Sequence, residues 1–127
     1  MSEAVLDASA LIAFLRNEPG AEKVAEVLGR SCISAVNLAE CMGKMVEYGK
    51  PLEDVAYQID RLQIPVIPFD GAHAKIVASL LKPTRKAGLS LGDRACLALA
   101  MNLAIPAFTT ESDWEKCKLE VKIVKIR

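Results

Sequence analysis

The sequence has no net charge, few aromatic residues and no long apolar run. Its sixteen basic and sixteen acidic residues give a formal net charge of zero, so the chain lacks the global positive field of proteins that hold nucleic acid mainly by neutralising phosphates. No stretch reaches the roughly 18 to 20 apolar residues of a membrane-spanning helix. Glu3 and Asp7 interrupt the N-terminal apolar run, which is unlike a secretory signal peptide. We therefore expect a cytoplasmic protein without membrane attachment.

Residues that commonly bind zinc are also scarce. The four cysteines are spread along the chain without any Cys-x-x-Cys pair, and there is one histidine, His73. Without ligand spacing, the sequence predicts buried, reduced thiols and no zinc site or disulfide. We interpret His73, in the first turn of an expected helix, as a surface residue. The cysteines are Cys32, Cys41, Cys96 and Cys117.

What the chain does contain is apolar side chains, which make up 52% of its 127 residues. This length suits a single domain spanning residues 1–127 with one core. The high apolar share favours a sheet that is buried on both faces, with an apolar subunit interface besides. We therefore expect an oligomer, most simply a homodimer.

Short apolar strands alternate with amphipathic helices along the chain. This order predicts an α/β fold with a mostly parallel central sheet and helices on both of its faces. The lysines of the last expected strand suit a sheet edge. Expected strands are 4–6, 31–33, 64–68, 107–109 and one within 121–126, and expected helices are 10–16, 21–28, 35–48, 52–62, 72–81 and 95–103.

Acidic residues follow or flank several of these strands. Asp7 comes directly after the first strand, Glu111 and Asp113 follow the strand at 107–109, and Glu40 lies in the second turn of the helix after the second strand. Because the carboxyl ends of parallel strands meet at one edge of a sheet, these acids can gather there. Glu40 could instead lie on a solvated helix face.

Asp93 has two interpretations of its own. It stands three residues after Ser90, a spacing typical of a capping box, so its carboxylate could simply accept a hydrogen bond from the Ser90 backbone amide. Gly92 beside it removes side-chain bulk where a ligand could approach, and the helix start adds a positive dipole end. The second interpretation places Asp93 with the other acids.

Clustered carboxylates repel one another, and each is costly to bury with its charge. A hard divalent cation such as Mg²⁺ or Mn²⁺ removes that conflict because it prefers oxygen ligands. Such a site suits phosphodiester hydrolysis by water, in which the cation offsets phosphate charge and stabilises the leaving oxygen.

Four motifs follow one another along the chain: Val5-Leu6-Asp7-Ala8-Ser9, Asn37-Leu38-Ala39-Glu40, Leu91-Gly92-Asp93-Arg94-Ala95 and Thr109-Thr110-Glu111-Ser112-Asp113-Trp114. In this order they resemble the signature of PIN-domain proteins, and among them the VapC-type ribonuclease toxins of toxin–antitoxin pairs. The resemblance implies a three-layer sandwich with a five-stranded parallel sheet, Mg²⁺ or Mn²⁺ dependence, RNA cleavage, homodimerisation and inhibition by a cognate antitoxin. It implies that Asp7, Glu40 and Asp93 are the main metal ligands and catalytic acids, with Ser9 supporting the first.

The fourth acid is left open because this chain departs from the family's usual Thr-x-Asp. Glu111 stands at that position as a candidate catalytic acid, one methylene longer, and Asp113 two residues on is the candidate metal ligand. Candidate RNA contacts are Arg85 and Lys86, in a basic segment that is either a solvated connection or a lip attracting phosphate, and Arg94.

Two other functions stay open. If the acids are only capping residues and solvated charges, the chain is a catalytically inactive interaction module. A phosphatase whose first-strand aspartate is the nucleophile usually needs another aspartate two residues later, and this chain has Ser9 there. Metal-dependent endoribonuclease activity is the function we favour.

Overall fold

The computed structural model describes residues 1–127 and is built around one five-stranded sheet in the order β3-β2-β1-β4-β5. All four neighbouring pairs run parallel, which confirms the expected sheet. The strands are β1 (Ala4–Leu6), β2 (Ser31–Ser34), β3 (Val66–Ile67), β4 (Ala107–Thr109) and β5 (Ile123–Lys125).

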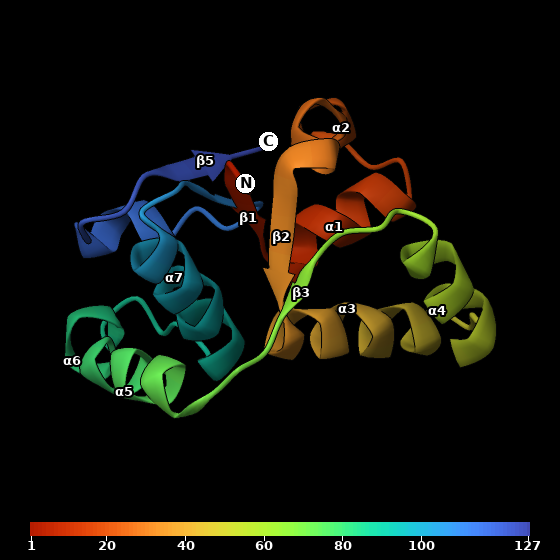
Figure 1. The fold of residues 1–127 in the computed structure, drawn as a ribbon. Helices are drawn as coiled ribbons and strands as arrows, with labels where there is room; N and C mark the ends of the chain where they lie inside the picture. The colour runs from red at the N-terminus through yellow and green to blue at the C-terminus, as the bar shows by residue number, and fades with distance from the viewer.

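Helices cover both faces of the sheet, giving the three layers expected of the fold class. In Figure 1, α1, α3 and α4 lie on one side of β1 and β2, and α5, α6 and α7 lie on the other. The helices are α1 (Ala8–Leu15), α2 (Ala21–Val27), α3 (Ala35–Glu47), α4 (Leu52–Asp60), α5 (Gly71–Ser79), α6 (Leu81–Thr84) and α7 (Leu91–Leu103). None of the helices could span a bilayer.

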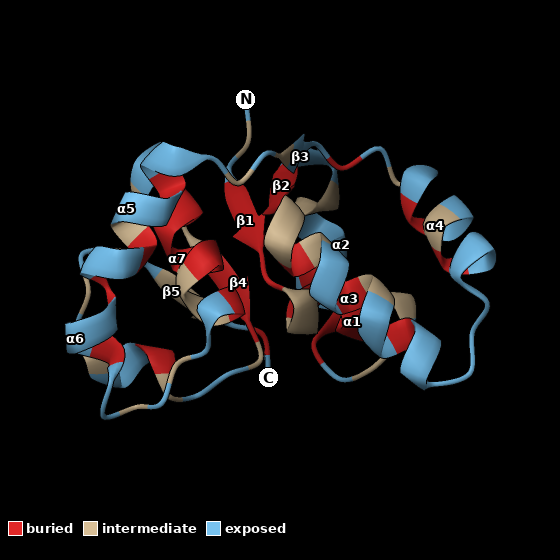
Figure 2. Cartoon of the chain, turned by 90° about the horizontal axis from the view of Figure 1, so that it is seen from below, coloured by how far each residue is buried: buried red, intermediate tan, exposed pale blue.

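Alternation along β1 explains the two apolar cores. Ala4 and Leu6 point into the core shared with α1 and α3, while Val5 points into the core shared with α5 and α7. Successive strand side chains face opposite sides of a sheet, so a strand covered on both faces must be apolar at every position. Figure 2 shows β1, β4 and much of α7 as buried.

Both edges of the sheet are short and carry polar or exposed residues. β3 has two residues between prolines, and β5 ends at the exposed Lys125. Proline and lysine at an edge discourage pairing with another strand. The lysines of the last strand therefore lie where the sequence predicts them.

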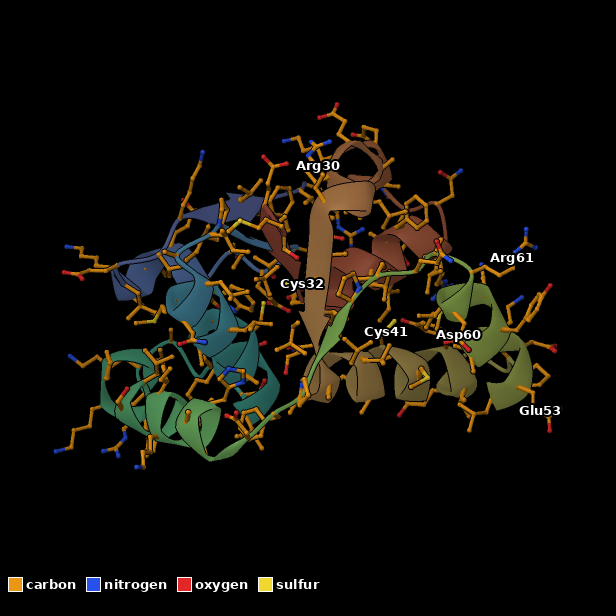
Figure 3. All side chains as sticks on the ribbon, viewed as in Figure 1. Arg30, Cys32, Cys41, Glu53, Asp60 and Arg61 are labelled. Atoms are coloured by element: carbon orange, nitrogen blue, oxygen red, sulfur yellow. The ribbon has the colours of Figure 1, made fainter.

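Three of the four cysteines are buried, as the sequence predicts, whereas Cys117 is half-buried. All four thiols are free, and Cys32 on β2 and Cys41 on α3 are buried within the body of the molecule (Figure 3). Burial raises the pKa of the Cys41 thiol to about 12, so this thiol stays protonated. Trp114 packs in the core shared with α5 and α7.

Three local expectations are wrong. His73 is buried, because α5 packs along α7 and the first turn of α5 lies beside the ring of Phe69. The basic segment after Leu81 is not all loop, since α6 occupies its start. Helix α1 begins at Ala8, before the expected Ala10, because the Asp7 carboxylate caps it by accepting a hydrogen bond from the Ala10 amide.

Candidate active site

A cleft of about 300 Å³ lies beside the carboxyl ends of β1 and β4. Parallel pairing sets β1 and β4 side by side, with Leu6 opposite Phe108, so the residues that follow each strand come together. The starts of α3 and α7 pack against each other and bring further side chains to the same edge. The acids Asp7, Glu40, Asp93 and Glu111 line this cleft together with Glu18.

Asp7 is the most deeply held of these acids. Its Oδ1 accepts hydrogen bonds from Ser9 Oγ at 2.7 Å and from the Ala10 amide at 2.8 Å. Its Oδ2 accepts one from Thr109 Oγ1 at 2.6 Å. Burial raises the pKa of Asp7 to about 6, opposed by these hydrogen bonds and helped by the negative charge of Asp93. The charged carboxylate is therefore held at a cost that a nearby cation would relieve.

Ser9 and Thr109 tie the turn after β4 to the start of α1. Ser9 Oγ accepts a hydrogen bond from the Thr110 amide at 3.0 Å, and Thr109 Oγ1 accepts one from the Glu111 amide at 3.0 Å. These two hydroxyls contact Asp7 and at the same time fix the backbone that carries Glu111. As a result, Glu111 lines the cleft.

Glu40 is positioned by Asn37 and Gly92. The buried Asn37 Nδ2 donates to Glu40 Oε1 at 3.0 Å and to the Gly92 carbonyl at 2.9 Å. The Glu40 carboxylate lies so close to Gly92 that a Cβ there would overlap it. Although Glu40 is an exposed residue of α3, its carboxylate faces the cleft. Partial burial raises its pKa, the Asn37 hydrogen bond lowers it and Asp93 raises it.

Asp93 takes both of the roles that its sequence context allows. Its Oδ2 accepts the Ser90 amide at 3.0 Å, and its own amide donates to Ser90 Oγ at 3.1 Å, which completes the capping box of α7. The same residue lines the cleft, where its charge raises the pKa of Asp7 and of Glu40. Capping and site membership are compatible because the cap uses Oδ2 alone.

The structure does not bring Asp113, the candidate metal ligand of the sequence analysis, to this cleft. Asp113 lines a separate hollow with Lys82 and Lys86, and its Oδ1 accepts a hydrogen bond from Lys116 Nζ at 2.9 Å. By residue 113 the chain has turned toward α6 and enters the short 3-10 helix Trp114–Cys117. Of the two acids after β4, only Glu111 lines the cleft.

The three candidate RNA contacts also lie outside the cleft. Arg94 Nη1 donates to the Val77 carbonyl at 3.1 Å, which fastens α7 to α5. Lys86 lines the hollow that contains Asp113, and Arg85 is exposed without lining either cavity. The sequence shows that a residue is basic but not which way its side chain points. That direction follows only from the fold.

Several cleft residues escaped the sequence analysis. Lys44 stands one helical turn after Glu40 and Tyr48 one turn further, so i, i+4 spacing could have found both. Thr109, which does not line the cleft but donates to Asp7, belongs to a motif that the sequence analysis used, and had no role of its own there. Arg127 reaches the cleft only through the tertiary fold and had no local signal.

The donor atoms of the cleft fit a hard divalent cation by their chemistry. They are carboxylate oxygens, the ligands that Mg²⁺ and Mn²⁺ prefer, and burial together with the charge of Asp93 raises the pKa values of Asp7 and Glu40. In the structure no three acidic side chains gather closely enough to enclose one ion. The cleft therefore fits a divalent cation by the type of its donor atoms and because the acids share one cleft.

Comparisons with known proteins agree with this architecture. The PIN domain family model matches residues 4–119. A DNA-bound VapBC structure from Salmonella typhimurium has a TM-score of 0.77 and 16% identity, with 100% of each chain covered. A toxin-antitoxin complex from Klebsiella pneumoniae has a TM-score of 0.75 and 18% identity over 98% of each chain.

A third similar structure is VapBC-5 from Mycobacterium tuberculosis. It has a TM-score of 0.61 and 22% identity over 97% of this chain and 98% of that one. No curated protein sequence matches the chain. At such low identities, the structural likeness establishes the fold alone.

Proposed function

Because the chain belongs to the PIN domain family, we propose that it is a metal-dependent endoribonuclease that hydrolyses RNA phosphodiester bonds. The observation that carries the proposal is the meeting of Asp7, Glu40 and Asp93, from three distant segments, in one cleft. Burial raises the pKa values of Asp7 and Glu40, and the charge of Asp93 raises them further. Such a strained acidic cleft is suited to a cationic cofactor.

In this proposal Asp7, Glu40 and Asp93 would hold Mg²⁺ or Mn²⁺. When bound, such an ion offsets phosphate charge and lowers the pKa of a coordinated water. Ser9 and Thr109 orient the Asp7 carboxylate through their hydroxyls, and Asn37 orients Glu40.

Glu111 is the fourth acid of the proposed site. It is an exposed residue at the cleft, and its backbone is fixed by Thr109. It could therefore accept a proton from the attacking water without the desolvation cost that Asp7 bears.

A cleavage assay with a matched pair of variants tests this function. Labelled RNA should be cut in the presence of Mg²⁺ or Mn²⁺ and left intact with EDTA. Asp93→Asn should lower the rate by about 10³-fold or more, since loss of several kcal/mol of metal-based stabilisation has that effect, while the amide can still accept the Ser90 hydrogen bond.

Asp113→Asn is the control, because it removes the same charge outside the cleft and should leave cleavage within about twofold of wild type, as remote surface changes usually do. Cleavage that persists in EDTA, or that Asp93→Asn leaves intact, would overturn the assignment. A catalytically inactive interaction module predicts no cleavage by any of the three proteins.

We further propose that the protein is the toxin of a type II toxin–antitoxin pair, acting in the cytoplasm as a homodimer. The similar structures include toxin–antitoxin complexes. The cleft suggests how inhibition would work. An antitoxin side chain carrying positive charge would relieve the repulsion among Asp7, Glu40 and Asp93 and exclude the metal.

Copurification with a small protein encoded by the adjacent gene tests this role. The partner should inhibit RNA cleavage, and alanine at its cleft-reaching basic residue should weaken inhibition by about 10-fold or more, as truncation of a buried charge partner does. Expression without the partner should arrest growth. Normal growth, with cleavage activity confirmed in the same cells, would contradict the toxin role.

A further inference from the structure

Besides the proposed metal ligands, the cleft is lined by an aromatic and two basic side chains. These are Tyr48, Lys44 and Arg127, and Arg127 is paired with the acid Glu18. Glu40, Lys44 and Tyr48 follow one another at four-residue spacing from α3 into its C-terminal cap, so they share a face. The helical rise places Tyr48 about 12 Å beyond Glu40.

The guanidinium of Arg16 covers one face of the Tyr48 ring. The guanidinium carbon of Arg16 lies 3.7 Å from the ring centroid, within the range of a cation–π contact. Tyr48 nevertheless remains 52% exposed. A flat group covered on one side and lining a cleft offers its other face to a ligand.

Charged residues from distant segments hold this arrangement. Arg16 Nε lies 3.7 Å from Glu18 Oε2, and Arg127 Nη1 donates to Glu18 Oε1 at 3.2 Å. Arg127 also donates to the Pro19 carbonyl at 3.1 Å. Arg16 is thereby restrained beneath the ring, which reduces the conformational entropy lost when a ligand stacks on Tyr48.

We propose that Tyr48 is a stacking platform for an RNA base within about four nucleotides of the scissile phosphate, the span that 12 Å allows at the ~3.4 Å spacing of stacked nucleotides. Lys44, between the platform and the acids, binds an intervening phosphate. Aromatic rings and Arg planes are the surfaces on which proteins stack unpaired bases. The inference rests on the proposed ribonuclease function and adds single-stranded RNA as its substrate.

Three variants test the platform. Tyr48→Leu keeps bulk over Arg16 but removes the aromatic face, so KM for single-stranded RNA should rise about 10- to 100-fold with kcat within about threefold. Tyr48→Phe keeps the ring and should remain near wild type. Tyr57→Leu is the matched control, because Tyr57 is also exposed, at 65%, and also has an Arg neighbour, Arg61, with 5.7 Å from guanidinium carbon to ring centroid.

Tyr57 lies outside the cleft on α4, and Figure 3 shows Arg61 at the end of that helix opposite Glu53. Tyr57→Leu should therefore leave KM unchanged. Unfolding midpoints of all variants, measured by circular dichroism, separate a binding defect from misfolding. An unchanged KM in Tyr48→Leu, or an equal rise in Tyr57→Leu, overturns the proposal.

A binding experiment separates this inference from the function on which it rests. A single-stranded 12-nucleotide RNA containing 2-aminopurine is titrated with Asp93→Asn protein, where stacking on Tyr48 should quench the fluorescence. When Tyr48→Leu is introduced into the Asp93→Asn protein as a second substitution, the quenching should disappear and binding should weaken about 10- to 100-fold. If wild type cleaves RNA but Tyr48→Leu changes neither binding nor KM, only the platform fails. If nothing is cleaved yet Tyr48-dependent quenching persists, only the nuclease assignment fails.

Discussion

Asp7→Asn should abolish RNA cleavage and at the same time stabilise the folded protein at neutral pH. Cleavage is lost because the amide removes one negative charge from the proposed metal site, with an expected fall of about 10³-fold or more. Stability rises because the folded protein no longer has to bury a carboxylate. Asparagine can still cap α1 by accepting the Ala10 amide, so the helix start survives.

The sign of the stability effect follows from the pKa of Asp7, which burial raises from 3.8 to about 6. Below pH 4 the carboxyl is protonated in both folded and unfolded chains, and its burial has no ionisation cost. Between about pH 4 and 6 the unfolded chain releases its proton first, so the wild type loses stability as the pH rises. Above pH 6 the loss approaches about 3 kcal/mol, at 1.36 kcal/mol for each pKa unit.

Urea unfolding in EDTA at pH 3.5 and pH 7.5 measures this effect. The free energy of unfolding of Asp7→Asn should exceed that of wild type at pH 7.5 and match it at pH 3.5. Asp60→Asn is the control, since Asp60 is exposed on α4 (Figure 3) and its removal should change stability by only a few tenths of a kcal/mol. A variant that is less stable than wild type at pH 7.5 would contradict the buried-charge explanation.

Gly92→Ala should inactivate the enzyme without unfolding it. The new Cβ would overlap the Glu40 carboxylate, and because that carboxylate ends a flexible side chain, it can move away at little cost in stability. Displaced from the cleft, Glu40 could no longer join Asp7 and Asp93. We expect a fall in RNA cleavage of about 10²-fold, since misplacing a catalytic group by about 1 Å has that effect.

Gly71→Ala is the matched control for this change. Gly71 also lies in the first turn of a helix, and a Cβ there meets no atom within 4 Å. Both variants should gain up to about 1 kcal/mol of helix stability from the loss of a glycine, whereas cleavage should fall only in Gly92→Ala. Equal activity in the two variants would show that the position of Glu40 does not matter for the reaction.

The sequence predicted what local patterns determine. The strands at Ala4–Leu6 and Ala107–Thr109 match their expected bounds, because each is a short apolar run that the buried centre of a parallel sheet requires. The capping box between Ser90 and Asp93 was equally local, since both partners lie within one helical turn. Parallel order then predicted that acids following different strands would meet at one edge.

Contacts between distant segments could not be predicted in this way. Thr109 donates to Asp7 across 102 positions, and the contact between Arg16 and Tyr48 depends on how α1 and α3 pack. Asp113 shows that a short spacing can mislead as well. A spacing of two residues after Glu111 says nothing about the turn that carries its carboxylate to another hollow.

Asp7 follows β1 and also caps α1. The capping role limits which residues related chains could have at position 7. Even without selection for nuclease activity, a residue that cannot cap α1 would be disfavoured there, because loss of the cap costs about 1 kcal/mol of stability. Asparagine, serine and threonine keep the cap without the carboxylate. Homologues that have lost nuclease activity should therefore have one of these three residues at position 7. Such a substitution would mark a pseudoenzyme that keeps the fold without the activity.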